Sequence, residues 1–281
     1  MVEAKINQLL GHGIPAAFYI GFGVFFLLLT LKRCRHVEAM ANKNHQMSYS
    51  DVYPKEDPIV LRRAGYGILI CSLLGLIVEA TGGMRGTQHG LLHQLAHESM
   101  YISYLFVGAI FILEQRLYPY AHRYALSFAF LLCYFMWREH ALMKDEMGDR
   151  RIHMLQAEIN FALFLSWAYS SYNTKSLLSY VVSLSLIILN GCWLITAGLA
   201  GSYCNVTMHM VAPLFVLEAL FIASAIVMCT VFLKSTSNDM KSGTSGSKYS
   251  TLPIAGSEVC ELQTYSADDE EEHGLSIEVL Q

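Results

Sequence analysis

The stretch that decides the fold runs from residue 89 to residue 101 and reads His-Gly-Leu-Leu-His-Gln-Leu-Ala-His-Glu-Ser-Met-Tyr. Polar residues recur there at every fourth position, at His89, His93, His97 and Tyr101. Residues four apart share one face of an α-helix, so the spacing predicts a helix with one polar stripe. Residues 91–113 are also apolar enough to cross a bilayer. The histidines are therefore expected in the first turns of a membrane-spanning helix, where an imidazole needs a partner.

The composition indicates a polytopic membrane protein whose main partner is the lipid bilayer. Of the 281 residues, 54% are hydrophobic and only 15% are charged, which is too apolar for a soluble domain of this length. The net charge is -4, and the Lys and Arg residues are dispersed and form no basic face. Nucleic acid is therefore excluded as an expected partner.

Seven apolar segments have about the length that a bilayer requires. They cover residues 13–31, 64–80, 91–113, 121–137, 152–172, 177–199 and 211–233. The predicted fold class is therefore all-α, a polytopic seven-transmembrane-helix bundle spanning residues 13–233. Residues 1–12 are expected to form a short exoplasmic N-terminus. Residues 234–281 are rich in Ser, Gly, Thr and acidic side chains and are expected to form a disordered cytoplasmic tail.

The distribution of positive charge predicts the orientation in the membrane. Thirteen of the 19 Lys and Arg residues fall in the connections on the side that includes residues 32–63 and the tail. Positive residues are retained on the cytoplasmic side, so the N-terminus is predicted to be exoplasmic and the C-terminus cytoplasmic. The sequon Asn205-Val206-Thr207 agrees, because this topology places Asn205 in the lumen, where it could be glycosylated.

This topology gathers most of the histidines at one leaflet. Seven of the 11 fall at the exoplasmic end: His12, His89, His93, His97, His140, His153 and His209. Glu98 and Glu158 accompany them, and Gln156 and Asn160 share the face of His153 on the fifth segment. The cytoplasmic halves of several segments lack ionisable groups, so a binding pocket is favoured over a channel or a carrier.

The sharpest hypothesis for these residues is a site for a divalent metal such as zinc. Two histidines four residues apart can bind one ion from one helix face, and His93 and His97 are the preferred pair. The candidates to complete the site are His153, His12 and His209. Glu98 or Glu158 could orient a ligand or act as a base.

Other functions stay open at this point. Imidazoles titrate near pH 6.5, so the histidines could instead sense luminal protons. A zinc-dependent membrane hydrolase acting on a lipid is the main alternative, although no catalytic set can be assigned and a non-enzymatic role is preferred. A non-catalytic membrane scaffold, held together by hydrogen-bonded histidines, is the third class.

The tail contains a possible sorting signal. Residues 249–252 read Tyr-Ser-Thr-Leu, and the Tyr249-x-x-Leu252 spacing is the form that clathrin-adaptor proteins recognise. An acidic cluster follows at residues 268–272. Because short tyrosine motifs also occur by chance, an inert tail is the alternative.

Several residues resemble the pattern of one known family. They are Gly11-His12 with Pro15 and Phe18, His97-x-x-Met100-Tyr101, Glu146 with His153, and Gly191-x-Trp193. In this pattern the chain resembles the transmembrane protein 45 family, a seven-span family defined by a domain of unknown function. The resemblance covers the membrane region and not the tail. It implies a multi-pass protein of Golgi, endosomal or lysosomal membranes, with no settled activity.

Glycines and tryptophans in the apolar segments predict packing features. Gly75, Gly108, Gly191 and Gly198 are expected where two helices approach closely. Trp137 and Trp167 are interpreted as membrane-interface anchors or packing residues.

Overall fold

The structure is a computed structural model of the whole chain. It describes the backbone of residues 2–44, 56–82, 88–203 and 207–243. Side chains are described for residues 11–35, 56–78, 80, 98–200 and 207–229. The predictions for Asn205, for the sorting motif Tyr249–Leu252 and for disorder after residue 243 lie outside the described residues and stay predictions.

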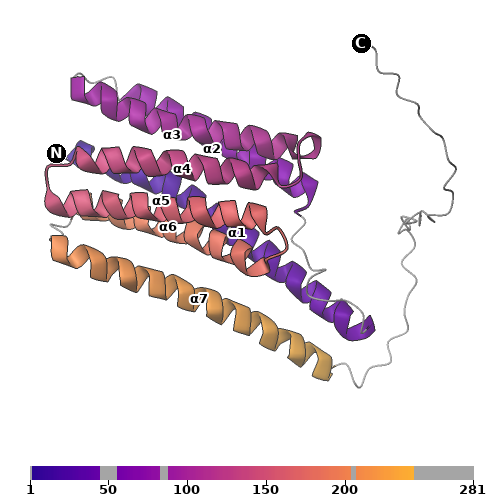
Figure 1. Cartoon of the computed structure of the whole chain (residues 1–281). Helices are drawn as coiled ribbons and strands as arrows, with labels where there is room; N and C mark the ends of the chain where they lie inside the picture. Colours follow the sequence, from indigo (N-terminus) through magenta and orange to yellow (C-terminus); the bar gives the residue numbers. More distant parts are fainter. Residues whose placement is uncertain (1, 45–55, 83–87, 204–206, 244–281) are drawn as a thin grey trace, which may run out of the picture. The chain divides into compact units, whose positions relative to one another are not determined.

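All the regular secondary structure in the described residues is helical, and those residues contain no strand. Figure 1 shows the helices in chain order. Their bounds are α1 Val2–Asn44, α2 Pro58–Gly82, α3 Gln88–Leu113, the short 3-10 helix η2 Glu114–Arg116, α4 Ala121–Leu142, α5 Met147–Tyr172, α6 Leu177–Tyr203 and α7 Met208–Gly243. Each of the seven predicted segments lies within one helix, so the all-α prediction is confirmed.

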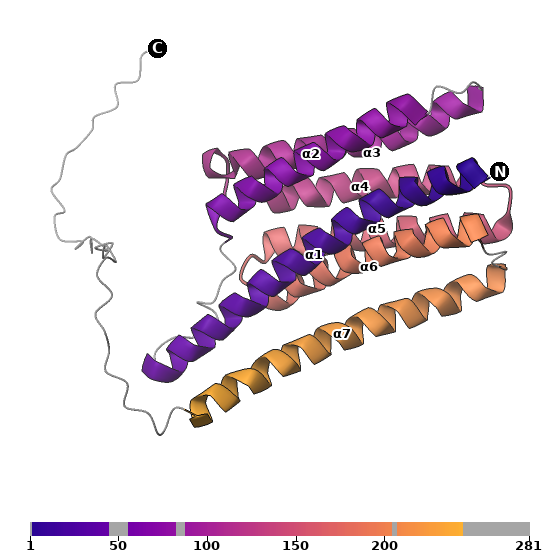
Figure 2. The same ribbon diagram turned by 180° about the vertical axis from the view of Figure 1, so that it is seen from behind.

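The helices pack mainly as three pairs. α1 lies along α6, α2 along α3 and α4 along α5, and the pairs are joined because α4 also contacts α3 and α5 also contacts α6 (Figures 1 and 2). Of these three pairs, only α1 and α6 are far apart in the sequence. Because successive helices run in opposite directions, the start of α1 lies at the same end as the end of α4 and the start of α5.

Glycines occur where the paired helices come closest, as the sequence predicts. A Cβ atom on Gly191 of α6 would lie 2.8 Å from the carbonyl oxygen of Ala16 on α1. A Cβ atom on Gly65 of α2 would lie 2.8 Å from the carbonyl oxygen of Gly108 on α3. Gly75 is covered by the ring of Tyr101. Any larger side chain at these positions would push the helices apart.

Four helices are long and apolar enough to cross a membrane within the described residues. These segments are Gly11–Arg35, Pro58–Val78, Leu177–Ala200 and Met208–Cys229. The chain is therefore a helical bundle of the membrane kind, with four candidate spans among the described residues against the seven that the sequence predicts. α4 and α5 fall outside this set because residues such as Arg123, Gln156 and Asn160 lower their hydropathy. Those three side chains are fully buried between helices, so the bundle rather than lipid surrounds them.

α7 packs on α6 through a few side chains. The Trp193 and Phe215 ring centroids lie 5.2 Å apart, and Thr196 Oγ1 donates to Glu218 Oε2 over 2.9 Å. Most other described side chains of α7 are exposed and apolar, including Leu217 and Phe221. This exposure suits a helix that faces lipid.

Candidate functional site

The structure describes five of the seven metal ligands that the sequence suggests, and it brings two of them together. His93 and His97 belong to α3, but their side chains lie outside the described residues. His209 on α7 and Glu158 on α5 are exposed, and Glu98 on α3 is partly buried. Of the described candidates, only His12 and His153 are brought together.

His12 and His153 meet a third imidazole, that of His140. The ring centroids of His140 and His153 lie 4.9 Å apart, and those of His12 and His153 lie 5.9 Å apart. All three side chains are buried, and the Trp137 ring lies 5.7 Å from that of His153. These residues come from α1, α4 and α5. We call His12, His140 and His153 the histidine cluster.

Asp149 holds the ring of His153 in place from one turn earlier on α5. His153 Nδ1 lies 3.1 Å from Asp149 Oδ1 and 2.8 Å from the Asp149 carbonyl oxygen. Lys144 Nζ lies 3.5 Å from the other carboxylate oxygen. Burial by itself would raise the pKa of Asp149, but the hydrogen bond and charge of His153, together with Lys144, lower the pKa below its ordinary value. Asp149 is therefore an ionised partner for the cluster.

With Nδ1 of His153 engaged, Nε2 is the nitrogen left to coordinate a ligand. His153 is 1% exposed, and Nε2 is buried without a hydrogen-bond partner among the described residues. A carboxylate on one imidazole nitrogen is the usual arrangement behind a metal-binding histidine. Two imidazoles on one tetrahedral ion have centroids about 5 Å apart, close to the spacing found here. Among the described side chains, however, no three His, Cys, Asp or Glu groups converge closely enough to hold an ion in this conformation.

A layer of buried amides follows the histidine cluster along α5. Gln156 Nε2 and Asn160 Nδ2 both donate to Asn190 Oδ1 of α6, and Asn160 Nδ2 also donates to the Gln156 carbonyl oxygen. All three residues are no more than 1% exposed. The prediction that Gln156 and Asn160 share the face of His153 is confirmed. The polar region therefore continues from the histidine cluster along α5 to Asn190 of α6.

The opposite end of the bundle buries a charged network. Arg123 Nη2 of α4 donates to Glu56 Oε1 over 2.8 Å. His122 Nε2 lies 3.5 Å from the same oxygen, and His122 Nδ1 lies 3.0 Å from Glu114 Oε1. We call Glu56, Glu114, His122 and Arg123 the arginine network.

Aromatic rings complete the surroundings of Arg123. Its guanidinium carbon lies 4.7 Å from the ring centroid of Tyr120 and 4.7 Å from that of Tyr180. Nη1 also donates to the carbonyl oxygen of Ser170 over 3.2 Å. Tyr120 has a φ of 66°, a left-handed conformation that a tyrosine rarely adopts, so the network stabilises a strained turn before α4.

The acidic members of the network are held ionised. Burial by itself would raise the pKa of Glu56, but the hydrogen bond and charge of His122 and the charge of Arg123 lower it to about 2. The pKa of Glu114 is likewise lowered by His122 against the opposing effect of burial. Because each buried charge meets an opposite one, removal of a single partner would leave a buried charge unpaired.

Sequence reasoning missed three contributors to these regions. The sequence groups His140 with the exoplasmic histidines but does not indicate it as a ligand, and it assigns no role to Asp149 or Arg123. For Arg123 a signal was present, because a charged residue in a predicted span needs a buried partner. For His140 no local spacing indicates the contact, since His12 and His153 lie on other helices.

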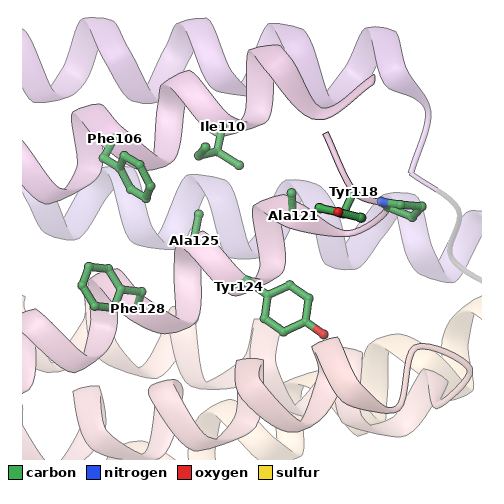
Figure 3. A pocket seen from close by; sticks show the side chains of 8 residues that line it. Phe106, Ile110, Tyr118, Ala121, Tyr124, Ala125 and Phe128 are labelled. Atoms are coloured by element: carbon green, nitrogen blue, oxygen red, sulfur yellow. The ribbon is translucent and has the colours of Figure 1, made fainter. Parts of the chain in front are cut away.

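The described bundle has an open groove and a smaller cavity. Figure 3 shows an open groove of about 680 Å³ between α3 and α4, with Phe106 and Ile110 on one side and Tyr124 and Phe128 on the other. Its exposed apolar rings fit contact with lipid tails. A smaller cavity of about 120 Å³ borders the histidine cluster and is lined by His12 and Trp137 among other residues.

Neither the protein-family models nor the curated proteins compared with this chain give a match.

Proposed function

We propose that this chain is a seven-span protein of endomembranes whose histidine cluster binds a divalent metal ion of the zinc type. In this proposal α3, α4 and α5 also cross the membrane, with the amino terminus exoplasmic. The histidine cluster then lies at the luminal end. The charge distribution of the connections and the resemblance to the transmembrane protein 45 family support this arrangement.

The observation that carries the proposal is the environment of His153. Its Nδ1 is bound to Asp149 while its Nε2 is buried without a hydrogen-bond partner among the described residues. A buried polar nitrogen that makes no hydrogen bond costs about 1–3 kcal/mol, and a metal ion would offset that cost. Rotation of the His12 and His140 rings would supply two more nitrogens, and an open fourth position would remain.

The surroundings of the histidine cluster also suit a bound divalent ion. Imidazole nitrogens bind a divalent ion without adding negative charge, and the ionised Asp149 nearby would balance part of the positive charge. The Trp137 ring covers the cluster and limits the access of water. The site therefore suits storage or sensing of an ion in a luminal compartment.

Trafficking of the protein would depend on the cytoplasmic tail. The Tyr249-x-x-Leu252 motif is proposed to bind clathrin adaptors and direct the chain to endosomes or lysosomes. Relocation of a Tyr249→Ala variant to the cell surface would support this role. Unchanged location would refute it.

The test of metal binding is elemental analysis of protein purified in detergent without chelator. We expect about one zinc ion per chain in the wild type and less than a tenth of that in His153→Gln. His209→Gln is the matched control, because His209 is exposed and lies outside the cluster, and it should retain the metal.

The variant His93→Ala/His97→Ala distinguishes the cluster from the pair that the sequence favours. Metal kept in this double variant and lost in His153→Gln supports the cluster. The reverse pattern overturns the cluster and assigns the ion to α3. Metal-free wild-type protein would refute metal binding, and it would leave proton sensing or helix packing as the role of these histidines.

A further inference from the structure

A carboxyl group lies inside the apolar stretch of α7. Met208–Cys229 is apolar enough to span a membrane, and Glu218 is the one Asp, Glu, Lys or Arg residue in its sequence. Glu218 follows Met208 by ten residues, which is about 15 Å of helix, and the hydrocarbon core of a bilayer is about 30 Å thick. In a helix that spans the membrane, this carboxyl group is therefore expected well inside the hydrocarbon.

The contacts of Glu218 give it a hydrogen bond and, among the described residues, no positive charge. Thr196 Oγ1 of α6 donates to Glu218 Oε2 over 2.9 Å. Glu218 Oε1 is buried without a hydrogen-bond partner in the described part of the chain. On the facing helix, the titratable group that interacts with the carboxyl group is the thiol of Cys192, one turn before Thr196. His209, the other titratable residue of the apolar stretch, lies more than two turns away along α7.

The side chains of α7 around Glu218 are apolar and exposed. Leu217 and Phe221 are 64% and 74% exposed, and Val216 and Leu220 are exposed as well. Exposed side chains of a membrane span contact lipid tails. Lipid and the apolar parts of α6 would therefore surround the carboxyl group, and water would be scarce there.

An ionised carboxylate would be costly in these surroundings. A charge in hydrocarbon is unfavourable unless it is paired, and an acid without a counter-charge takes up a proton instead. The hydrogen bond from Thr196 satisfies Oε2, whereas Oε1 would carry negative charge with no described donor. A proton on Oε1 removes that charge and leaves the bond from Thr196 in place. A divalent ion suits the site less well, because one carboxyl and one hydroxyl group supply too few ligands.

We propose that Glu218 is a proton-binding site inside the membrane, neutral at pH 7 and held against α6 by the hydroxyl of Thr196. The site belongs to α6 and α7 and contains no histidine. It therefore goes beyond the metal site, and it needs no ion.

A protonated carboxyl group in a bilayer can be recognised by its reaction with a hydrophobic carbodiimide. The carboxyl oxygen bonds to the central carbon of the reagent, the acid proton moves to one of its nitrogens, and no group leaves. The adduct rearranges to a stable N-acylurea of the same mass. An ionised carboxylate lacks the proton that this addition requires.

The test treats the full chain in lipid nanodiscs with dicyclohexylcarbodiimide and, in parallel, with a water-soluble carbodiimide. Mass spectrometry of peptides locates the added mass. We expect dicyclohexylcarbodiimide to label Glu218 at pH 7 at no less than half of its rate at pH 5. Glu139, exposed near the end of α4, is the internal reference. Its labelling by the soluble reagent should fall at least tenfold between pH 5 and pH 7, because a carboxyl group in water is largely ionised at pH 7.

Two variants assign the label. Glu218→Gln should abolish it on the α7 peptide, and Glu139→Gln is the matched control that should leave it unchanged. The pH series in the wild-type protein needs no variant, so the test holds even if Glu218→Gln fails to fold. Chelator should not alter the label, so the result is independent of the metal site.

Three outcomes would overturn the proposal. The first is an absence of label on Glu218 at pH 7, and the second is a fall of tenfold or more between pH 5 and pH 7, because each would show an ionised carboxylate. The third is equal labelling of Glu218 by the two reagents, which would show that water reaches the group.

Discussion

The arginine network and the histidine cluster lie at opposite ends of the same bundle and bury polar side chains in different ways. In the network, Glu56 meets both Arg123 and His122, and Glu114 meets His122. In the cluster, imidazoles meet other imidazoles, and only Asp149 among the described contacts supplies an opposite charge to His153. Paired buried charges satisfy one another within the fold, whereas the buried Nε2 of His153, without a described partner, indicates a ligand. The predictions below test this difference.

The largest effect on the stability of the protein is expected from Glu56→Gln. The change leaves Arg123 buried without its carboxylate, and we expect a loss of about 3–5 kcal/mol in the free energy of unfolding. Chemical unfolding in mixed micelles would measure it. The variant Glu56→Gln/Arg123→Met removes both charges and should recover most of the stability. A loss below about 1 kcal/mol in the single variant would show that the pair contributes little.

The next effect concerns acid stability. The pKa of Glu56 is lowered from 4.5 to about 2, so its contribution to stability is complete above pH 4.5 and is lost as the pH falls towards 2. That contribution corresponds to about 3 kcal/mol. Unfolding measured from pH 6 to pH 2 should therefore show a steeper loss in the wild type than in Glu56→Gln. Parallel curves would contradict the lowered pKa.

A smaller loss of stability is expected from a change in the layer of buried amides, which is formed by Gln156, Asn160 and Asn190 between the two ends of the bundle. Asn190→Leu removes the oxygen that accepts from Gln156 and Asn160. Leaving the buried Gln156 amide unpaired should cost about 1–3 kcal/mol in the same unfolding measurement. Gln156→Leu/Asn190→Leu removes both partners and should be more stable than Asn190→Leu alone. If the double variant is less stable, the layer has a role beyond mutual pairing.

The smallest change in stability is expected in the histidine cluster. His153→Gln loses the bond to Asp149, but it removes a buried nitrogen that has no described hydrogen-bond partner, so the net loss should be about 1 kcal/mol or less in metal-free protein. Measuring unfolding with and without zinc separates the two roles. Zinc should stabilise the wild type and have no effect on the variant. Equal stabilisation of both would place the ion elsewhere.

Part of the fold follows from local patterns. The apolar segments predict the helices, because the period and length of each segment are properties of consecutive residues. The glycine positions predict close approach, and the spacing of His153, Gln156 and Asn160 predicts a shared buried face. All three predictions agree with the described structure.

The sequence by itself therefore determined the all-helical membrane architecture and the polar face of α5, since both depend on neighbours within four residues along the chain. Only the tertiary structure decided which partners meet that face. His12 and His140 reach His153 because α1 and α4 pack beside α5, and Glu56 reaches Arg123 from a connection 67 residues earlier. Helix pairing fixes such contacts through shape and burial summed over whole helices, and no short spacing in the sequence carries that information.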